Sequence, residues 1–387
     1  MNELPQSLEP EITLEESPDL VSGRMSELRT WAKEKGVEEV ECHTPDFAGI
    51  ARGKVMPAAK WFTGVQTRLP TSVFFATITG SYADSPHREL WSDADMILQP
   101  DLHTAASLPW ATVPSIQVIH DVLDLDGKPI DFAPRTVLRR VLDQYKDLGW
   151  QPIVAPELEF YLTKPNTDPN LPLEPPQGRS GRTQRTNQAF SMQGIDEYES
   201  VIDHIYDFAE AQGVEIDTII QEFGPAQLEV NLVHGDAMNK ADEVFIFKRT
   251  VREAALRCGC YATFMAKPIE GHAGNAMHIH QSVQSIHSGE NIFSQEDGVR
   301  RTDAALRDCQ RALGLRHTAQ RANCVAVRAK QLLDQHVGGH HSHLRVLTNV
   351  DGNHTLRRPE GLHEALNLIA PQSHGSQVES GHLWVLL

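Results

Sequence analysis

The sequence contains little cysteine and no long apolar run. Its five cysteines are scattered through 387 residues. They are too few for a disulfide framework, and the close pair Cys258 and Cys260 has no second pair to complete a zinc site. No stretch approaches the roughly 18 apolar residues of a membrane helix. The first 23 residues carry six acidic side chains and no basic one, the opposite of a signal peptide. These absences predict a reduced, cytoplasmic protein.

Basic residues are scarce relative to acidic ones. Lys and Arg number 35 against 52 Asp and Glu, a formal charge of -17, which argues against a nucleic-acid or anionic-membrane surface because both need a net basic face. Neither the phosphate-loop pattern G-x-x-x-x-G-K-[ST] nor the dinucleotide pattern G-x-G-x-x-G occurs, so any nucleotide is held in another way. The length and the 40% hydrophobic content are typical of a soluble protein of two domains.

Apolar periodicity and turn residues predict an α+β chain, with strands and helices in runs and not in strict alternation. Helical spacing predicts helices over residues 25–35, 134–145, 198–212 and 241–258. Strand patterns cover residues 37–54 with a turn at 45–46, 73–98, 151–162, 216–233, 261–267 and 277–283. Residues 166–187 are rich in Pro, Gly and Arg, which predicts a long functional loop.

The two ends of the chain differ from its middle. Residues 1–23 are acidic and contain three prolines, which predicts a disordered lead-in. From residue 298 on there is no Phe or Tyr, Trp384 is the one aromatic residue, and nine histidines occur. Such a segment does not build the core that the preceding chain implies, so residues 298–387 are predicted to be an atypical tail, disordered or out of frame. His340, His341 and His343 leave a metal-binding tail open as a third interpretation.

Two glutamates of one predicted strand are candidate metal ligands. Glu157 and Glu159 stand at i and i+2, so both project from one face and repel each other unless a cation lies between them. An isolated pair of this kind is typical of a solvated strand face. The apolar neighbours Leu158 and Phe160 favour a buried strand instead.

Further candidate ligands follow along the chain. Glu222 and Glu229 would face opposite ways on one straight strand, but the break at residues 224–225 allows both to point into one cavity; an exposed loop is the alternative. His278 and His280 supply two imidazoles on one strand face, and alone such a pair is typical of a surface or a zinc site. Four carboxylates with a histidine select a hard divalent ion, Mg²⁺ or Mn²⁺. Two such ions can neutralise a transferring phosphoryl group.

Six segments carry a resemblance to a known family. They are residues 156–161 (PELEFY), 221–231 (QEFGPAQLEVN), 231–236 (NLVHGD), 247–249 (FKR), 262–268 (ATFMAKP) and 277–282 (MHIHQS). In this order they resemble the glutamine synthetase family, over residues 25 to 298. The resemblance implies a small β-grasp domain over residues 24–130, then a large α+β catalytic domain whose N-terminal part is residues 131–297. It also implies a ring-forming homo-oligomer with sites shared between neighbouring subunits.

The resemblance also implies a role for each candidate residue. Glu159, Glu222 and Glu229 would be the catalytic carboxylates that bind a first metal, and Glu157 and His278 would bind a second metal over the nucleotide phosphates. His280 and Ser282 match positions near the nucleotide, and the backbone around Gly274 matches the glutamate-binding loop. The implied reaction joins the γ-carboxylate of glutamate to an amine at the expense of ATP, through a γ-glutamyl phosphate.

Three departures from the family pattern bear on the function. Thr79 stands where ammonia-using members carry an Asp, and the loop at residues 271–276 lacks the usual Asn before its Gly. Both changes resemble the γ-glutamyl-polyamine ligase branch, in which an amine such as putrescine replaces ammonia. After Ser294 the sequence contains none of the segments N-S-Y-x-R-L, N-R-T and R-x-E-x-R, which supply the family's phosphate-binding arginines and a remaining carboxylate. A catalytically impaired relative, truncated or a pseudoenzyme subunit that retains metal and nucleotide binding, is therefore the alternative to a ligase.

Overall fold

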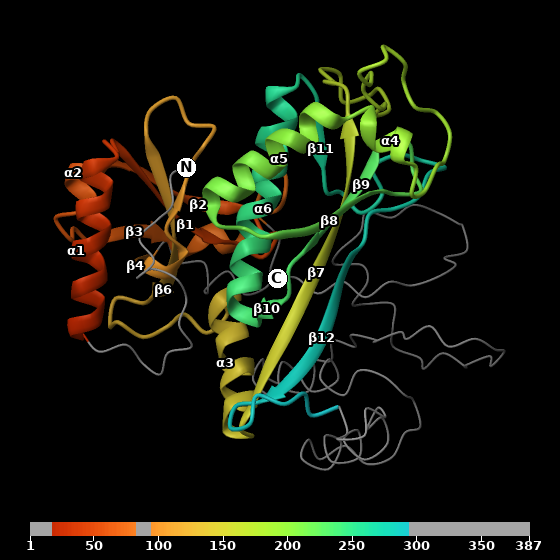
Figure 1. Ribbon diagram of the computed structural model, residues 1–387. Coiled ribbons are helices and arrows are strands. Elements are labelled where there is room, and N and C mark those ends of the chain that lie inside the picture. Colours follow the sequence, from red (N-terminus) through yellow and green to blue (C-terminus); the bar gives the residue numbers. More distant parts are fainter. Residues whose placement is uncertain (1–17, 83–93, 294–387) are drawn as a thin grey trace. The chain divides into compact units, whose positions relative to one another are not determined.

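The computed structural model describes residues 18–82 and 94–293 (Figure 1). Of these residues, 18–143 and 151–282 belong to one compact unit, and 144–150 and 283–293 belong to another. The predicted lead-in before residue 18 and the predicted tail over 298–387 lie outside the described residues. Within the described ranges, no helix combines the length and the hydropathy needed to cross a membrane.

The first part of the chain forms a mixed six-stranded sheet. Its strand order is β2-β1-β6-β4-β3, with β5 also on β6, and β1 and β6 are parallel whereas the other pairs are antiparallel. The elements are α1 Pro18–Glu34, β1 Glu39–Pro45, β2 Ala51–Pro57, α2 Ala58–Trp61, β3 Thr67–Pro70, η2 Thr71–Phe75, β4 Asp95–Pro100, η4 Leu102–Thr104, β5 Ala106–Ser107 and β6 Ser115–Leu123. Leu28 of α1 and Val40, Ile116 and Val118 of the sheet share one buried core.

Two expectations for this part of the chain were wrong. Helix α1 begins at Pro18, ahead of the predicted start at Met25 and inside the predicted lead-in, because proline is favoured at the first helical position. Residues 73–75, at the start of the predicted strand segment 73–98, instead belong to the 3-10 helix η2, Thr71–Phe75. This helix buries Phe74 against Phe47, with ring centroids 5.7 Å apart, and this aromatic packing outweighs the strand propensity of the segment.

The second sheet is built around the long strand β7. Its order is β10-β7-β9-β8, with β11 and β12 also paired to β7. The elements are α3 Pro134–Asp147, β7 Trp150–Thr163, α4 Met192–Asp196, α5 Glu199–Gln212, β8 Ile216–Gln221, β9 Gln227–Leu232, β10 Gly235–Asp236, α6 Ala237–Arg257, β11 Tyr261–Thr263 and β12 Met277–Ser285. No helix or strand lies between β7 and α4, in agreement with the loop predicted over residues 166–187. Helix α4 itself was not predicted from the sequence.

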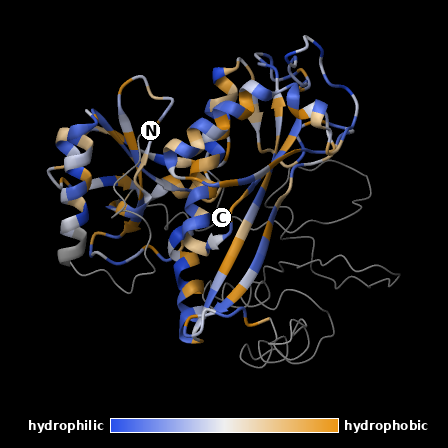
Figure 2. Ribbon diagram, viewed as in Figure 1, coloured by the Kyte–Doolittle hydropathy of each residue, from blue (hydrophilic) through white to orange (hydrophobic). Residues whose placement is uncertain are grey.

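Strands β7 and β9 alternate between two faces. Figure 2 shows hydrophobic and hydrophilic segments in succession along β7. The apolar side chains that pack in one core with α5 and α6 are Leu158, Phe160, Leu228, Val230 and Leu232. Because neighbouring residues of a strand point to opposite faces, Glu157, Glu159 and Glu229 project from the face away from these helices. The sheet therefore separates its apolar core from its acidic side chains.

A buried ion-pair network ties α3 and α6 to the first sheet. The Arg135 guanidinium of α3 lies 2.6 Å from Asp101 Oδ2, 2.6 Å from Asp121 Oδ1 and 2.8 Å from Asp242 Oδ2. Its side chain is 6% exposed. Three carboxylates from separate elements thus share one cation, so removing that cation leaves them buried and mutually repelling.

Candidate metal centre

Three of the predicted ligands meet on the acidic face of the second sheet. Glu159, Glu222 and Glu229 each place a carboxylate oxygen within 4.8 Å of the other two. Glu159 of β7 lies directly opposite Glu229 of β9 in the antiparallel register, which brings the two side chains together on one face. Glu222 follows β8 directly. Strand pairing and one turn therefore suffice to assemble the cluster.

The turn between β8 and β9 brings Glu222 toward Glu229, as the break at residues 224–225 predicts. The Glu222 N–H donates to the Gln227 carbonyl oxygen at 2.8 Å, which closes the hairpin. The turn is tight at Gly224, where an added Cβ would lie 1.9 Å from Tyr161 Oη. Only glycine fits this position without displacing the buried Tyr161 ring.

A second cluster shares a member with the first. Glu157, Glu229 and His278 also place their ligand atoms within 4.8 Å of one another. His278 Nδ1 lies 3.4 Å from Glu157 Oε2 and 4.0 Å from Glu159 Oε1. His280 Nε2 lies 2.7 Å from Glu157 Oε1. Both imidazoles thus face the Glu157 carboxylate, and Glu229 belongs to both clusters.

Burial and mutual repulsion define the electrostatics of the centre. Glu229 is 7% exposed, and burial, followed by the charges of Glu157, Glu222 and Glu159, raises its pKa to about 7. Burial and the charges of Glu159 and Glu222 raise the pKa of Tyr161 to about 12. A bound divalent cation would offset this concentration of negative charge. A ligand set of carboxylate oxygens with one imidazole nitrogen fits Mg²⁺ or Mn²⁺.

Gln227 holds a candidate metal ligand in place through hydrogen bonds. This role was not predicted from the sequence, although the residue lies in segment 221–231. Its side chain is fully buried. Gln227 Nε2 donates to Glu159 Oε2 at 3.1 Å and to the Gly274 carbonyl oxygen at 3.0 Å, while its Oε1 accepts from the Gly224 N–H at 2.9 Å. The sequence signal for this role was an amide side chain two residues before Glu229, and therefore on the same face of β9.

The loop around Gly274 lies beside these ligands. An added Cβ on Gly274 would lie 2.7 Å from the Ala266 carbonyl oxygen, so the loop packs closely there. The Asn275 side chain, itself buried, donates to the carbonyl oxygens of Thr263 and Met265. The Ala276 N–H donates to Glu159 Oε2 at 3.0 Å. On β12, His280 is exposed and Ser282 is half-buried.

Residues 131–327 match the family model described as glutamine synthetase, catalytic domain, which covers more than half of the chain. The chain belongs to the glutamine synthetase family. The match continues past residue 298, where the resemblance in short motifs ends. The part of the match after residue 293 lies outside the described residues.

Relatives of known structure or curated sequence agree with this membership. Gamma-glutamylputrescine synthetase PuuA of Escherichia coli (strain K12) is 35% identical over 261 residues, 65% of this chain and 54% of the relative. Glutamine synthetase of Pyrococcus horikoshii is 34% identical over 210 residues, 54% of this chain and 44% of the relative. The solved structure "Apo GmaS without ligand" aligns with a TM-score of 0.59 and 25% identity, over 74% of this chain and 64% of that chain.

These alignments confirm the expected α+β fold class. The chain spans about half the length of the curated relatives that it matches.

Proposed function

We propose that this member of the glutamine synthetase family is an ATP-dependent ligase that joins the γ-carboxylate of glutamate to an amine. The observation that carries the proposal is the pair of carboxylate clusters that share Glu229. Two adjacent cation sites suit phosphoryl transfer, in which negative charge spreads over the transferring group and its donor. Glu159, Glu222 and Glu229 would hold one ion, and Glu157 and His278, with Glu229 between the clusters, would hold the other.

The proposed reaction proceeds in two steps. A glutamate γ-carboxylate oxygen attacks the γ-phosphorus of ATP, which forms γ-glutamyl phosphate and releases ADP. The amine nitrogen then attacks the acyl carbon, loses a proton and displaces inorganic phosphate, which leaves a γ-glutamyl amide. Bound Mg²⁺ or Mn²⁺ would neutralise charge on the phosphates. The loop at Gly274 would bind glutamate, and His280 and Ser282 would lie near the nucleotide.

A primary amine such as putrescine is the proposed acceptor in place of ammonia. Thr79 replaces the ammonium-binding Asp of ammonia-using relatives, and its Oγ1 lies 3.1 Å from Thr77 Oγ1 in an exposed turn. A neutral hydroxyl there lacks the charge that attracts ammonium. The relative named gamma-glutamylputrescine synthetase supports the same acceptor class. Cytoplasmic location and ring assembly complete the proposal.

A second candidate is a subunit that binds metal and nucleotide without catalysis. It is favoured by one sequence observation, the lack of the family's arginine-bearing segments after Ser294. Loss of such cationic groups removes several kcal/mol of transition-state stabilisation, on the order of 3 kcal/mol for each donor.

ADP release by the purified full-length chain distinguishes the two candidates. The assay contains ATP, Mg²⁺ and glutamate, with ammonium or putrescine added in turn. A Glu159→Gln variant tests for a contaminating ligase, and Glu174→Gln, a change in an exposed carboxylate that pairs with Lys164, is the matched control. The ligase proposal expects putrescine-dependent turnover in wild type and Glu174→Gln, with a higher kcat/KM than for ammonium, and none in Glu159→Gln. Metal binding without any turnover would favour the second candidate.

A further inference from the structure

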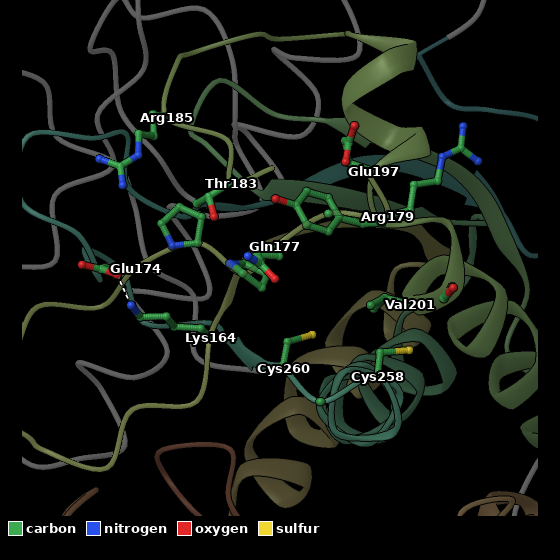
Figure 3. Close-up of a pocket in the computed structure, with 16 residues that line it drawn as sticks. Lys164, Glu174, Gln177, Arg179, Thr183, Arg185, Glu197, Val201, Cys258 and Cys260 are labelled. Atoms are coloured by element: carbon green, nitrogen blue, oxygen red, sulfur yellow. Dashed lines mark ion pairs between the residues drawn. The ribbon is translucent and has the colours of Figure 1, made fainter. Parts of the chain in front are cut away.

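A pocket separate from the metal centre lies between the 164–185 loop, the start of α5 and the end of α6. Its volume is about 660 Å³, within the roughly 300–1,000 Å³ of small-molecule sites. None of the candidate metal or substrate residues lines it. Figure 3 shows Lys164 and Arg185 on one side of the pocket, and Arg179 and Glu197 on the other.

The Tyr198 hydroxyl is the strongest sign that this pocket takes a ligand. Tyr198 lines the pocket and is 3% exposed. Its hydroxyl has no hydrogen-bond partner among the residues that the structure describes. Buried hydroxyl groups almost always have a partner, because an unpaired one loses the hydrogen bonds it makes with water. Burial, with the neighbouring Glu197 charge, raises the pKa of Tyr198 above its usual range, so the hydroxyl keeps its proton and can donate.

The charged side chains that line the pocket favour an anion. The two acidic side chains of the lining already have partners, since Lys164 pairs with Glu174 and the Ser180 N–H donates to Glu197 Oε2 at 3.1 Å. Arg185 forms no ion pair within residues 18–82 and 94–293. A guanidinium of this kind presents a fork of donors that matches a carboxylate or a phosphate.

The N-terminus of α5 adds further hydrogen-bond donors that favour an anion. This helix runs for 14 residues, and its N-cap residue Tyr198 makes no side-chain capping bond. Ser200 and Val201 of its first turn line the pocket. The Val201 N–H donates to the Tyr198 carbonyl oxygen at 3.0 Å, whereas the Ser200 N–H has no acceptor within the helix. The helix dipole is positive at this end. An oxyanion seated here would accept from both the helix and the Tyr198 hydroxyl.

We infer that this pocket binds a small metabolite through a carboxylate or a phosphate group, held by Arg185, the Tyr198 hydroxyl and the N-terminus of α5. The inference does not depend on the proposed ligase activity, because no residue of the metal centre takes part.

Calorimetric titration of the full chain tests this site. Inorganic phosphate and succinate are the two probes, and EDTA is present so that metal-dependent binding at the carboxylate clusters is absent. Tyr198→Phe removes only the unpaired hydroxyl, and Arg185→Ala removes the unpaired cation. Arg182→Ala is the matched control, since Arg182 is an exposed arginine of the same loop that does not line the pocket.

The inference expects saturable binding of phosphate, of succinate or of both; the probe that binds identifies the ligand group. We expect Kd to rise about tenfold in Tyr198→Phe and roughly ten- to hundredfold in Arg185→Ala, with Arg182→Ala unchanged. The melting temperature of Tyr198→Phe should be equal to or above that of wild type, which excludes misfolding as the cause. No saturable binding of either probe, or equal Kd values in wild type, Tyr198→Phe and Arg185→Ala, would overturn the inference.

Discussion

Gln227 and Glu159 are joined by a buried hydrogen bond, with Gln227 Nε2 3.1 Å from Glu159 Oε2. The same amide group lies 3.0 Å from the Gly274 carbonyl oxygen and 3.0 Å from Asn275 Oδ1. One side chain therefore orients a candidate metal ligand and holds the loop proposed to bind glutamate. Orienting Glu159 and holding the loop both require the hydrogen bonds of the amide group, which an apolar side chain of the same size would not form.

Replacing Gln227 by Ala should destabilise the chain. The change leaves Glu159 Oε2 with one donor fewer and strips the Gly274 oxygen of a buried partner, so we expect a loss of about 2–3 kcal/mol in the free energy of unfolding. Urea denaturation followed by circular dichroism measures it. Gln193→Ala, at an exposed position of α4, is the control and should change stability by less than about 0.5 kcal/mol. Equal stabilities of the two variants would show that Gln227 does not hold this region together.

The raised pKa of Glu229 predicts a pH-dependent stability in EDTA. Its pKa rises from the ordinary 4.5 to about 7 on folding, so the folded chain favours the protonated form. The stability that this group contributes is complete below about pH 4.5 and is lost as the pH rises through 7. Glu229→Gln removes the charge, and should therefore stabilise the metal-free chain by about 1–2 kcal/mol at pH 8 with little effect at pH 5. Urea titrations at both pH values test this; the same gain at pH 5 and pH 8 would contradict it.

Gly224→Ala should disturb the loop at residues 273–276 through Tyr161. The added Cβ would lie 1.9 Å from Tyr161 Oη, which donates to the Ala273 carbonyl oxygen at 2.8 Å. We expect a destabilisation of about 1–3 kcal/mol, as for other overpacked sites. Tyr161→Phe in the same chain removes the closest clashing atom and leaves Tyr161 Cζ at 2.6 Å and Gln227 Oε1 at 2.8 Å. A double-mutant cycle should therefore give a loss somewhat smaller than the sum of the two changes. Strict additivity would show that the clash is relieved elsewhere.

The four-member network around Arg135 should contribute far more than a surface ion pair. Arg135→Met leaves Asp101, Asp121 and Asp242 without their shared cation, which should cost about 3–5 kcal/mol. Arg139→Met is the matched control, because Arg139 also pairs with Asp121, at 2.9 Å, but is 42% exposed. That change should cost less than about 1 kcal/mol. Chemical denaturation of both variants at pH 7 gives the comparison, and similar losses would refute a special role for Arg135.

The sequence predicted the parts of this structure that depend on local pattern. Strand alternation predicts that Glu157 and Glu159 share one face, and the break at residues 224–225 allows Glu222 and Glu229 to point into one cavity. The roles assigned to these residues, to His280 and to Ser282 stay predictions. A shared Glu229 was not foreseen, because membership of both clusters depends on side-chain positions across three strands.

Contacts between distant segments escaped the sequence analysis. The partners of Arg135 lie 34, 14 and 107 positions away, and no local pattern marks such a set. The bond from Gln227 to Gly274 spans 47 positions. The helical state of Thr71–Phe75 was likewise decided by tertiary packing of Phe74, which local propensity does not contain.

Manganese binding to the full chain, measured by electron paramagnetic resonance, tests the central claim most directly. The account predicts two Mn²⁺ ions for each chain. Glu229→Gln should weaken both sites by about tenfold or more, Glu222→Gln should weaken one site, and the control Glu174→Gln should weaken neither. Two sites with unchanged affinity in Glu229→Gln, or no Mn²⁺ binding by the wild-type chain, would contradict a paired metal centre built on this residue.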